Sequence, residues 1–296
     1  MIEARPAGWR QAGGAALPVL SVLALLLLVW YFAAIALNAP QVRERLPPDA
    51  GFLALVGGTW SMTRPVLPAP HQIVAELQKS VFERPVTSPR SLVYHAGVTL
   101  SAALVGLALA LGLGVALAVG IVHVRTLDRS LMPWVIASQT VPVLAIAPMV
   151  VVVLGNIGIT GLLPKAAIAG YLSFFPITVG MVTGLRSPDP LQLDLMRTYS
   201  AASWQIFAKL RWPASLPFLF PGLRVAVALA LVGAIVAELP TGAEAGLGAR
   251  LLGASYYGQT IQIWATLVVA SVLSVAALFV VGLVERGVTI MRGGRM

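Results

Sequence analysis

The chain contains no cysteine and few charged side chains. None of its 296 residues is Cys, and 10% are Asp, Glu, Lys or Arg, against about 25% in soluble domains. The lack of cysteine excludes a disulfide framework and thiolate-based metal or redox chemistry. The three histidines, His71, His95 and His123, lie too far apart in sequence for their spacing to indicate a metal site. We therefore expect the chain to bind no metal.

A nucleotide-binding loop is also missing. The glycine-rich segment 240–260, PTGAEAGLGARLLGASYYGQT, lacks the Gly-Lys-Ser/Thr ending of a phosphate-binding loop. We therefore expect no ATPase site and no bound nucleotide cofactor in this chain. The few ionisable groups inside its apolar runs are dispersed, which argues against a membrane-embedded active site. The sequence predicts that the protein is not an enzyme.

Apolar residues are abundant. They make up 58% of the chain, against about 45–50% in soluble domains, so no soluble fold could bury them all. The net charge of +9 would suggest nucleic acid as the partner of a soluble protein. In a membrane protein it is better explained by basic loops that face the anionic cytoplasmic leaflet of the bilayer. We predict an all-α polytopic membrane protein with the lipid bilayer, and no nucleic acid, as a partner.

The apolar runs predict about six transmembrane helices and their boundaries. The runs cover approximately residues 15–38, 93–122, 131–154, 159–185, 218–239 and 261–284. The first is longer than the 7–15 residue core of a signal peptide, so we expect a retained helix after a cytoplasmic head, 1–14. An external loop, 39–92, should carry an amphipathic helix that begins at Pro70. The core permeation domain is then 93–296, interrupted by a polar segment, 187–217.

Small residues recur at every fourth position of the second run. They are Ala102, Gly106, Ala110, Gly114 and Ala118. Such a ridge lets a second helix approach closely, because van der Waals contact joins helices in lipid. We predict that this face packs against another helix and does not touch solute.

Polar groups and prolines in the third run indicate a bent helix. Gln139, Thr140, Pro142 and Pro148 lie in the sequence SQTVPVLAIAP. Prolines free backbone carbonyls that need other partners, and a glutamine at membrane depth is costly unless it faces protein or water. Gln139 and Thr140 would line a solute pathway, or Gln139 would only bond a neighbouring helix.

Two other positions are candidates for the pathway. Ser173, Phe174 and Phe175 lie near the middle of the fourth run, where the aromatic pair would form an apolar gate or simply pack. Glu238 ends the fifth run and would line the external mouth or cap neighbouring backbone. Arg224, 14 residues earlier, lies roughly 21 Å away along a helix, so the two cannot pair within it.

The segment 194–213, DLMRTYSAASWQIFAKLRWP, is polar and lies between two apolar runs. Asp189 and Pro190 should begin a first short helix, with Leu191, Leu195 and Tyr199 on one face. Ser203 should cap a second helix whose apolar side holds Trp204, Phe207 and Leu210, and Pro213 and Pro217 should end that helix. The chain offers no soluble domain to cover these faces, so we expect a partner protein to do so.

The distribution of Lys and Arg predicts the orientation. With the N-terminus inside, cytoplasmic segments hold eleven of these residues and external segments seven, six of them in the long loop 39–92. The short external loops therefore hold one, which agrees with the positive-inside rule. Both termini and the segment 194–213 should then be cytoplasmic.

The polar segment resembles the EAA loop of bacterial ABC importer permeases. That motif reads E-A-A, three residues, G, nine residues, I, one residue, L-P. Asp194, Leu195 and Met196 stand at E-A-A, Ser200 at the glycine, Leu210 at the isoleucine, and Trp212-Pro213 at L-P. A fuller likeness covers approximately 67–283, including LPAPHQIVAEL, SQTVPVLAIAP and VAELP, and is closest to permeases for nitrate, taurine, sulfonates and precursors of thiamine or riboflavin.

The resemblance implies a role for the segment in ATPase coupling. The residues it assigns to coupling are Asp194, Leu195, Met196, Tyr199, Ser200, Ala201, Trp204, Phe207, Leu210 and Pro213. Met196 and Ser200 depart from the motif, and Ser200 would be strained if its φ is positive. We expect the region from Tyr199 to Phe207 to touch the partner.

The resemblance also implies the assembly. Two permease copies would form the pore in the bacterial inner membrane, most simply as a homodimer. Two ABC ATPase subunits would bind ATP and Mg²⁺ beneath it, and an external solute-binding protein would deliver the solute. A secondary transporter remains an alternative, although the chain shows neither inverted repeats nor ion-coupling charges at the midplane. ELPTG, GLGARLL and SYYGQT favour a pyrimidine, thiamine-precursor or riboflavin-like solute over sulfonate, taurine or nitrate.

Overall fold

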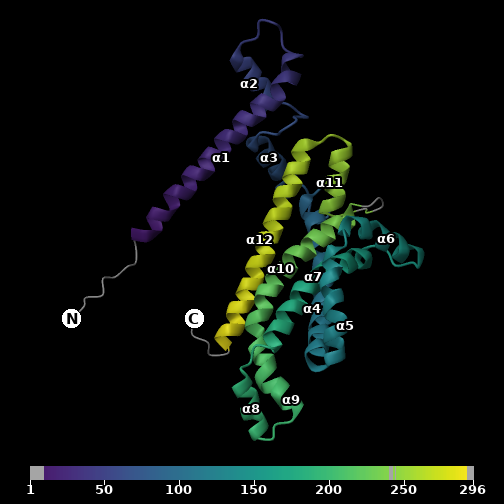
Figure 1. Cartoon of the computed structure of the whole chain (residues 1–296). Helices are drawn as coiled ribbons and strands as arrows, with labels where there is room; N and C mark the ends of the chain where they lie inside the picture. The colour runs from purple at the N-terminus through teal and green to yellow at the C-terminus, as the bar shows by residue number, and fades with distance from the viewer. Residues whose placement is uncertain (1–9, 240–242, 244, 292–296) are drawn as a thin grey trace, which may run out of the picture. The chain divides into compact units, whose positions relative to one another are not determined.

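The computed structural model describes residues 10–239, 243 and 245–291, and within these residues all regular structure is helical (Figure 1). Five helical segments are long and apolar enough to cross a membrane, or up to six when one sharply bent pair counts as a single span. The predicted class, an all-α polytopic membrane protein with about six transmembrane helices, is confirmed.

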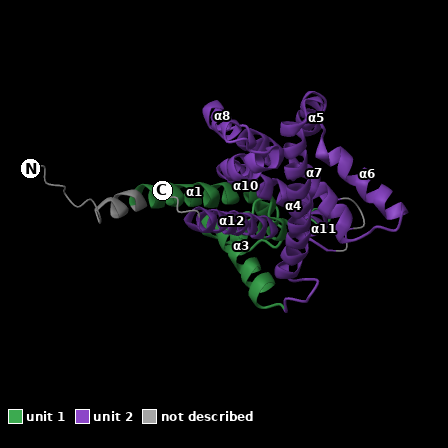
Figure 2. Cartoon of the chain, turned by 90° about the horizontal axis from the view of Figure 1, so that it is seen from below, with its two compact units in different colours: residues 1–84, 254–265 green, residues 85–253, 266–296 purple. Residues whose placement is uncertain are grey.

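The chain divides into two compact units (Figure 2). The first comprises residues 1–84 with 254–265, and the second residues 85–253 with 266–296. The amino-terminal helix and the long loop after it, up to residue 84, belong to the first unit. The three most tightly packed helices and the polar segment 194–213 belong to the second.

The first unit is built on α1 (Arg10–Arg43), α2 (Phe52–Trp60) and α3 (Pro70–Leu77), which a π-helical turn, Gln78–Phe82, extends. The predicted amphipathic helix starting at Pro70 is confirmed, whereas α2 was not predicted. Asn38 is buried and donates to the Leu67 carbonyl at 2.8 Å while accepting from the Val66 N–H at 2.7 Å. Because Asn38 has these partners, α1 continues five residues beyond its predicted end at residue 38.

The core of the second unit consists of α4 (Leu92–His123), α7 (Leu162–Leu185) and α10 (Trp212–Glu238). All five small residues of the predicted ridge on α4 are buried. A Cβ added to Gly106 would lie 2.6 Å from the Ala166 carbonyl oxygen, and one added to Gly222 would lie 2.6 Å from that of Pro176. The backbones of these helices touch, as small residues permit. The predicted packing face is confirmed.

A sharp break divides the third apolar run. α5 (Arg125–Ala137) and a 3₁₀ turn, Ser138–Thr140, are followed by α6 (Val143–Asn156), and the two parts meet at 100°. The predicted bend is therefore present, and Pro142, which cannot donate a backbone hydrogen bond, precedes α6.

Residues 123–130 separate the second and third predicted runs, where a polar turn would be expected, but α5 already starts at Arg125. Asp128 lies in its first turn, where the helix dipole favours a negative charge. Its carboxylate also pairs with Arg186 at 2.9 Å. These interactions stabilise helix where the polar composition suggested a loop.

The fifth span begins earlier than predicted. α9 (Ser203–Ile206), a π-helical turn, Phe207–Arg211, and α10 follow one another without a break, so Pro213 and Pro217 do not end the helix. Pro213 is the second residue of α10 and follows directly on the π-helical turn, where the backbone hydrogen-bond pattern changes. Pro217 is inside α10. Its neighbour Ser215 is buried against Gly184 of α7, where packing holds the helical backbone.

Candidate functional site

The first candidate site is the polar projection formed by α8 (Pro190–Thr198) and α9. Figure 1 shows both helices at one end of the second unit, beyond α4 and α7. The carboxylate of Asp189 accepts from the Leu191 N–H at 2.8 Å, and Pro190 is the first helical residue, as predicted. Asp194 and Arg197 form an exposed ion pair at 3.0 Å.

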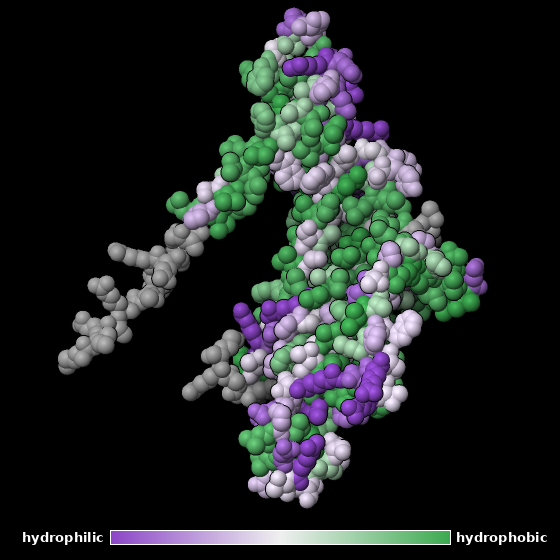
Figure 3. Space-filling view, in the orientation of Figure 1, coloured by the Kyte–Doolittle hydropathy of each residue, from purple (hydrophilic) through white to green (hydrophobic). Residues whose placement is uncertain are grey.

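One face of α8 is apolar and uncovered. Leu191, Leu195 and Tyr199 are 76%, 56% and 77% exposed, and Figure 3 shows apolar side chains beside hydrophilic ones at this end of the second unit. Nothing else in the described part of the chain covers these three residues. A contiguous apolar surface on a polar projection is typical of a protein-binding site.

The turn between α8 and α9 is strained at Ser200. Its φ is +55°, and it is the only residue other than glycine with a positive φ in the described part of the chain. The Ala201 N–H donates to the Met196 carbonyl at 3.0 Å and the Ser200 N–H to that of Arg197 at 2.8 Å. These bonds form a Schellman motif, which requires a left-handed residue after the helix. The condition set by the sequence analysis, strain at Ser200 if its φ is positive, is therefore met.

The cap of α9 differs from the prediction. Ser203 is the first helical residue, and Ala202 takes the capping position. The side-chain oxygen of Gln205 accepts from the Ala202 N–H at 2.9 Å. A glutamine three residues into a helix can reach back in this way, so the hydroxyl of Ser203 is not needed as the cap.

Two aromatic residues near this turn, Trp204 and Phe207, differ in their exposure. Trp204 is 66% exposed. Phe207, grouped with it in the sequence analysis, is half-buried and packs within the chain, with ring centroids 5.3 Å from His123 and 5.9 Å from Trp212. Trp204 is therefore a further exposed apolar side chain of the projection, whereas Phe207 joins the projection to the end of α4. The remaining coupling candidates are partly buried: Met196, Ala201, Leu210 and Pro213.

Further contacts fix the projection to the helical core. Arg211 donates to the Leu185 carbonyl at 2.9 Å and so caps the end of α7. Arg186, which directly follows Leu185, forms an ion pair with Asp128 of α5. Sequence reasoning missed these residues because a basic residue near a helix end gives no sign of its partner. A displacement of α8 and α9 would therefore be transmitted to the ends of α4, α5 and α7.

The pathway candidates do not form one site in this chain. Gln139, Thr140 and Pro142 are exposed at the break between α5 and α6. Ser173 is buried and donates to the Ala169 carbonyl within α7, while Phe174 belongs to the apolar core and Phe175 is half-buried. Tyr171 links the two regions by donating to the Ser138 carbonyl at 2.5 Å. Whether these residues touch solute stays a prediction.

Glu238 lies in a buried polar cluster at the other end of α10. Its side chain is fully buried and accepts from the Thr99 hydroxyl, 3.0 and 2.9 Å from the two carboxylate oxygens. The ammonium of Lys165 lies 3.8 Å from the same carboxylate and donates to the Ala245 carbonyl at 2.7 Å. Three core helices, α4, α7 and α10, thus all contribute polar side chains to the cluster.

The cluster caps α11 (Leu247–Tyr256). Three consecutive backbone N–H groups at its start donate to side chains: Gly246 to His95 Nδ1 at 3.0 Å, Leu247 to Thr99 Oγ1 at 2.9 Å and Gly248 to Glu238 Oε2 at 2.9 Å. Gly246 has a φ of +131°, and a Cβ there would lie 2.1 Å from the Glu238 carboxyl carbon. The sequence left two roles open for Glu238, lining the external mouth or capping neighbouring backbone. The structure shows the second, a hydrogen bond from the Gly248 N–H.

The apolar helices and the polar projection at one end define a multi-pass membrane protein. Within residues 10–239, 243 and 245–291, no group of three or more His, Asp or Glu side chains could hold a metal ion. The chain belongs to the family described as binding-protein-dependent transport system inner membrane component, whose sequence profile matches residues 108–290. It is thus a permease of the bacterial ABC import systems, as the resemblance implied.

Several curated permeases are similar over most of their length. The formylaminopyrimidine transport permease protein ThiX of Halalkalibacterium halodurans is 33% identical over 69% of this chain and 79% of its own. The riboflavin transport system permease protein RibX of Chloroflexus aurantiacus is 34% identical over 75% and 78%. The putative aliphatic sulfonates transport permease protein SsuC of Bacillus subtilis is 26% identical over 78% and 80%.

Proposed function

We propose that this chain is the membrane subunit of an ATP-driven importer and couples to separate ATPase subunits through α8 and α9. Two copies would form the solute pathway, with two ATPase subunits beneath and an external solute-binding protein above. ATP and Mg²⁺ would bind to the ATPase subunits. Membership of the family supports the general role. The observation that carries the coupling is the exposure of the apolar side chains Leu191, Leu195, Tyr199 and Trp204 on a projection fixed to the core.

The proposed solute is a small pyrimidine-type or riboflavin-like compound. The names of ThiX and RibX support this class, and both proteins are more similar to this chain than SsuC is. A sulfonate is the second candidate because of SsuC. Binding of labelled formylaminopyrimidine, riboflavin and an alkyl sulfonate to the cognate external protein would distinguish them.

Transport by the reconstituted complex tests the proposal directly. In proteoliposomes that contain the permease, its ATPase and its binding protein, uptake should require ATP and all three components. Uptake driven by a proton gradient without ATP would instead identify a secondary transporter. Chemical turnover of the solute by the isolated permease would identify an enzyme.

The strained turn gives a second test of coupling. Ser200→Val should lower uptake about tenfold, because a β-branched residue at φ +55° adds roughly 1–3 kcal/mol of strain and shifts the turn that orients Trp204. Ser200→Gly should retain uptake, since glycine adopts this conformation without strain. Uptake and ATP hydrolysis are measured for both variants at matched abundance. Equal activity of the two would show that the turn has no part in coupling.

A further inference from the structure

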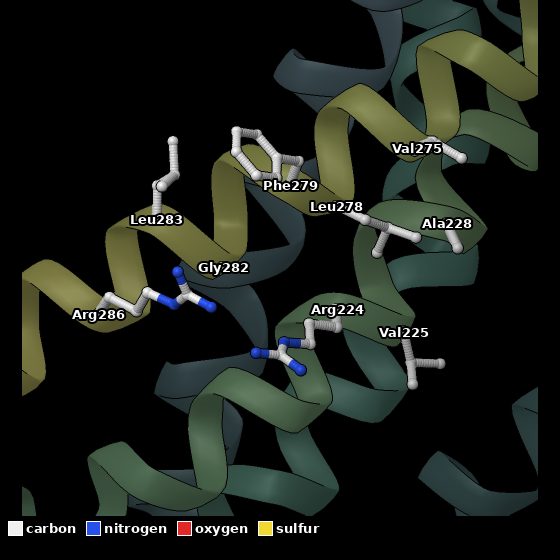
Figure 4. A pocket seen from close by; sticks show the side chains of 9 residues that line it. All are labelled: Arg224, Val225, Ala228, Val275, Leu278, Phe279, Gly282, Leu283 and Arg286. Atoms are coloured by element: carbon white, nitrogen blue, oxygen red, sulfur yellow. The ribbon is translucent and has the colours of Figure 1, made fainter. Parts of the chain in front are cut away.

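A groove separates the middle of α10 from the second half of α12 (Thr260–Met291). It is an open groove with a volume of about 710 Å³, within the range of about 300–1,000 Å³ typical of ligand pockets. Figure 4 shows the side chains that line it on the two helices. Its apolar walls are formed by Val225, Ala228, Val275, Leu278, Phe279 and Leu283. This volume and lining suit a hydrocarbon chain.

One end of the groove is positively charged. Arg224 of α10 and Arg286 of α12 both line it, and Figure 4 shows their guanidinium groups at the same end, between the helices. Arg224 forms an ion pair with Glu285, which is partly buried. This end thus holds two guanidinium groups and one carboxylate, which leaves a net positive charge beside an apolar groove.

The charged end lies near the side of the membrane predicted to be cytoplasmic. α10 and α12 both belong to candidate membrane spans. Arg224 is 14 residues from Glu238, or roughly 21 Å along the helix, so it lies toward the end of the span that carries the polar projection. Basic pockets between transmembrane helices on this side are suited to the head groups of anionic lipids.

We propose that this groove binds an anionic phospholipid of the cytoplasmic leaflet. The phosphate would lie between Arg224 and Arg286, since guanidinium groups form paired hydrogen bonds with phosphate oxygens. One acyl chain would run along Ala228, Val275 and Phe279. The net charge favours an anionic head group over a zwitterionic one, and the apolar walls favour a lipid over a free phosphate ion.

The proposal is tested by the lipid retained on the purified protein. The full chain is placed in nanodiscs of equal phosphatidylglycerol and phosphatidylethanolamine, extracted into detergent, and its bound lipids are counted by native mass spectrometry. Arg224→Gln and Arg286→Gln should each lower the ratio of retained phosphatidylglycerol to phosphatidylethanolamine about fivefold, the factor for one basic residue near a membrane surface. Arg129→Gln removes the same charge from an exposed position outside the groove and should not change the ratio.

Two further variants separate specific binding from a general loss of structure. Glu285→Gln should raise the ratio, because it removes the carboxylate that competes for Arg224. Ala228→Leu should lower the retention of both lipids by filling the apolar wall. The proposal is overturned if the arginine variants match Arg129→Gln, or if Ala228→Leu leaves lipid retention unchanged and instead separates permease dimers. The readout does not depend on transport, so it stands apart from the test of coupling.

Discussion

Replacing Trp204 with alanine is expected to lower the affinity of the permease for its ATPase subunits at least about thirtyfold, and uptake with it. A tryptophan in the centre of an interface is typically worth about 2 kcal/mol or more, and each 1.4 kcal/mol is about tenfold in affinity. Trp204 is 66% exposed, so its removal takes little from the packing of the permease itself. Co-purification of the ATPase and ATP-dependent uptake are the measurements.

Trp134→Ala is the matched control. Trp134 is 75% exposed but lies on α5, which is not part of the projection. Its replacement should leave ATPase binding unchanged, whereas Trp204→Ala should reduce it without changing the abundance of the permease in the membrane. If both variants bind the ATPase like the original protein, α9 is not the coupling surface.

Replacing Glu238 with alanine should destabilise the permease by about 3–5 kcal/mol, the usual effect of breaking a buried ion pair by removing one partner. The substitution leaves Lys165 without its carboxylate and the Gly248 N–H without its acceptor, both inside the protein. It also creates a cavity beside Gly246. Lower abundance in the membrane and an earlier thermal transition in detergent are the expected results.

Glu238→Gln and Glu83→Ala are the comparisons for this prediction. Glutamine retains an oxygen that can accept from Thr99 and the Gly248 N–H, but it loses the attraction to Lys165, so its effect should be smaller. Glu83 is exposed, and its removal should have no measurable effect. If the Glu238→Ala protein has the same melting temperature as the unsubstituted protein, the cluster contributes nothing to stability.

Local features were predicted well from the sequence. The small residues on α4, the cap at Asp189 and the turn at Ser200 all depend on spacing within a few residues. Their physical causes, close helix approach, capping and backbone sterics, act over that same short range. The sequence therefore predicted the start of the coupling projection and its turn.

Interactions between distant segments were not predicted. Glu238 and Thr99 are 139 residues apart, and Arg211 caps a helix that ended 26 residues earlier. A sequence shows that such a residue needs a partner but not which helix supplies it, because the partner depends on how the helices pack. The continuation of α10 through Pro213 and Pro217 escaped prediction for the same reason, since contact with α7 decides it.

The continuous helix from Ser203 to Glu238 has unequal stiffness along its length. Pro217 and Pro221 both lie inside α10, and each removes a backbone hydrogen bond that would otherwise resist bending. Nearer Glu238, α10 contains no proline, and Gly233 packs against Ala169 of α7. Between Ser215 and Gly222, close contact with α7 takes over the role of the backbone hydrogen bonds that the prolines remove, so a force applied at α9 should be passed to α7 in this stretch before it reaches the polar cluster.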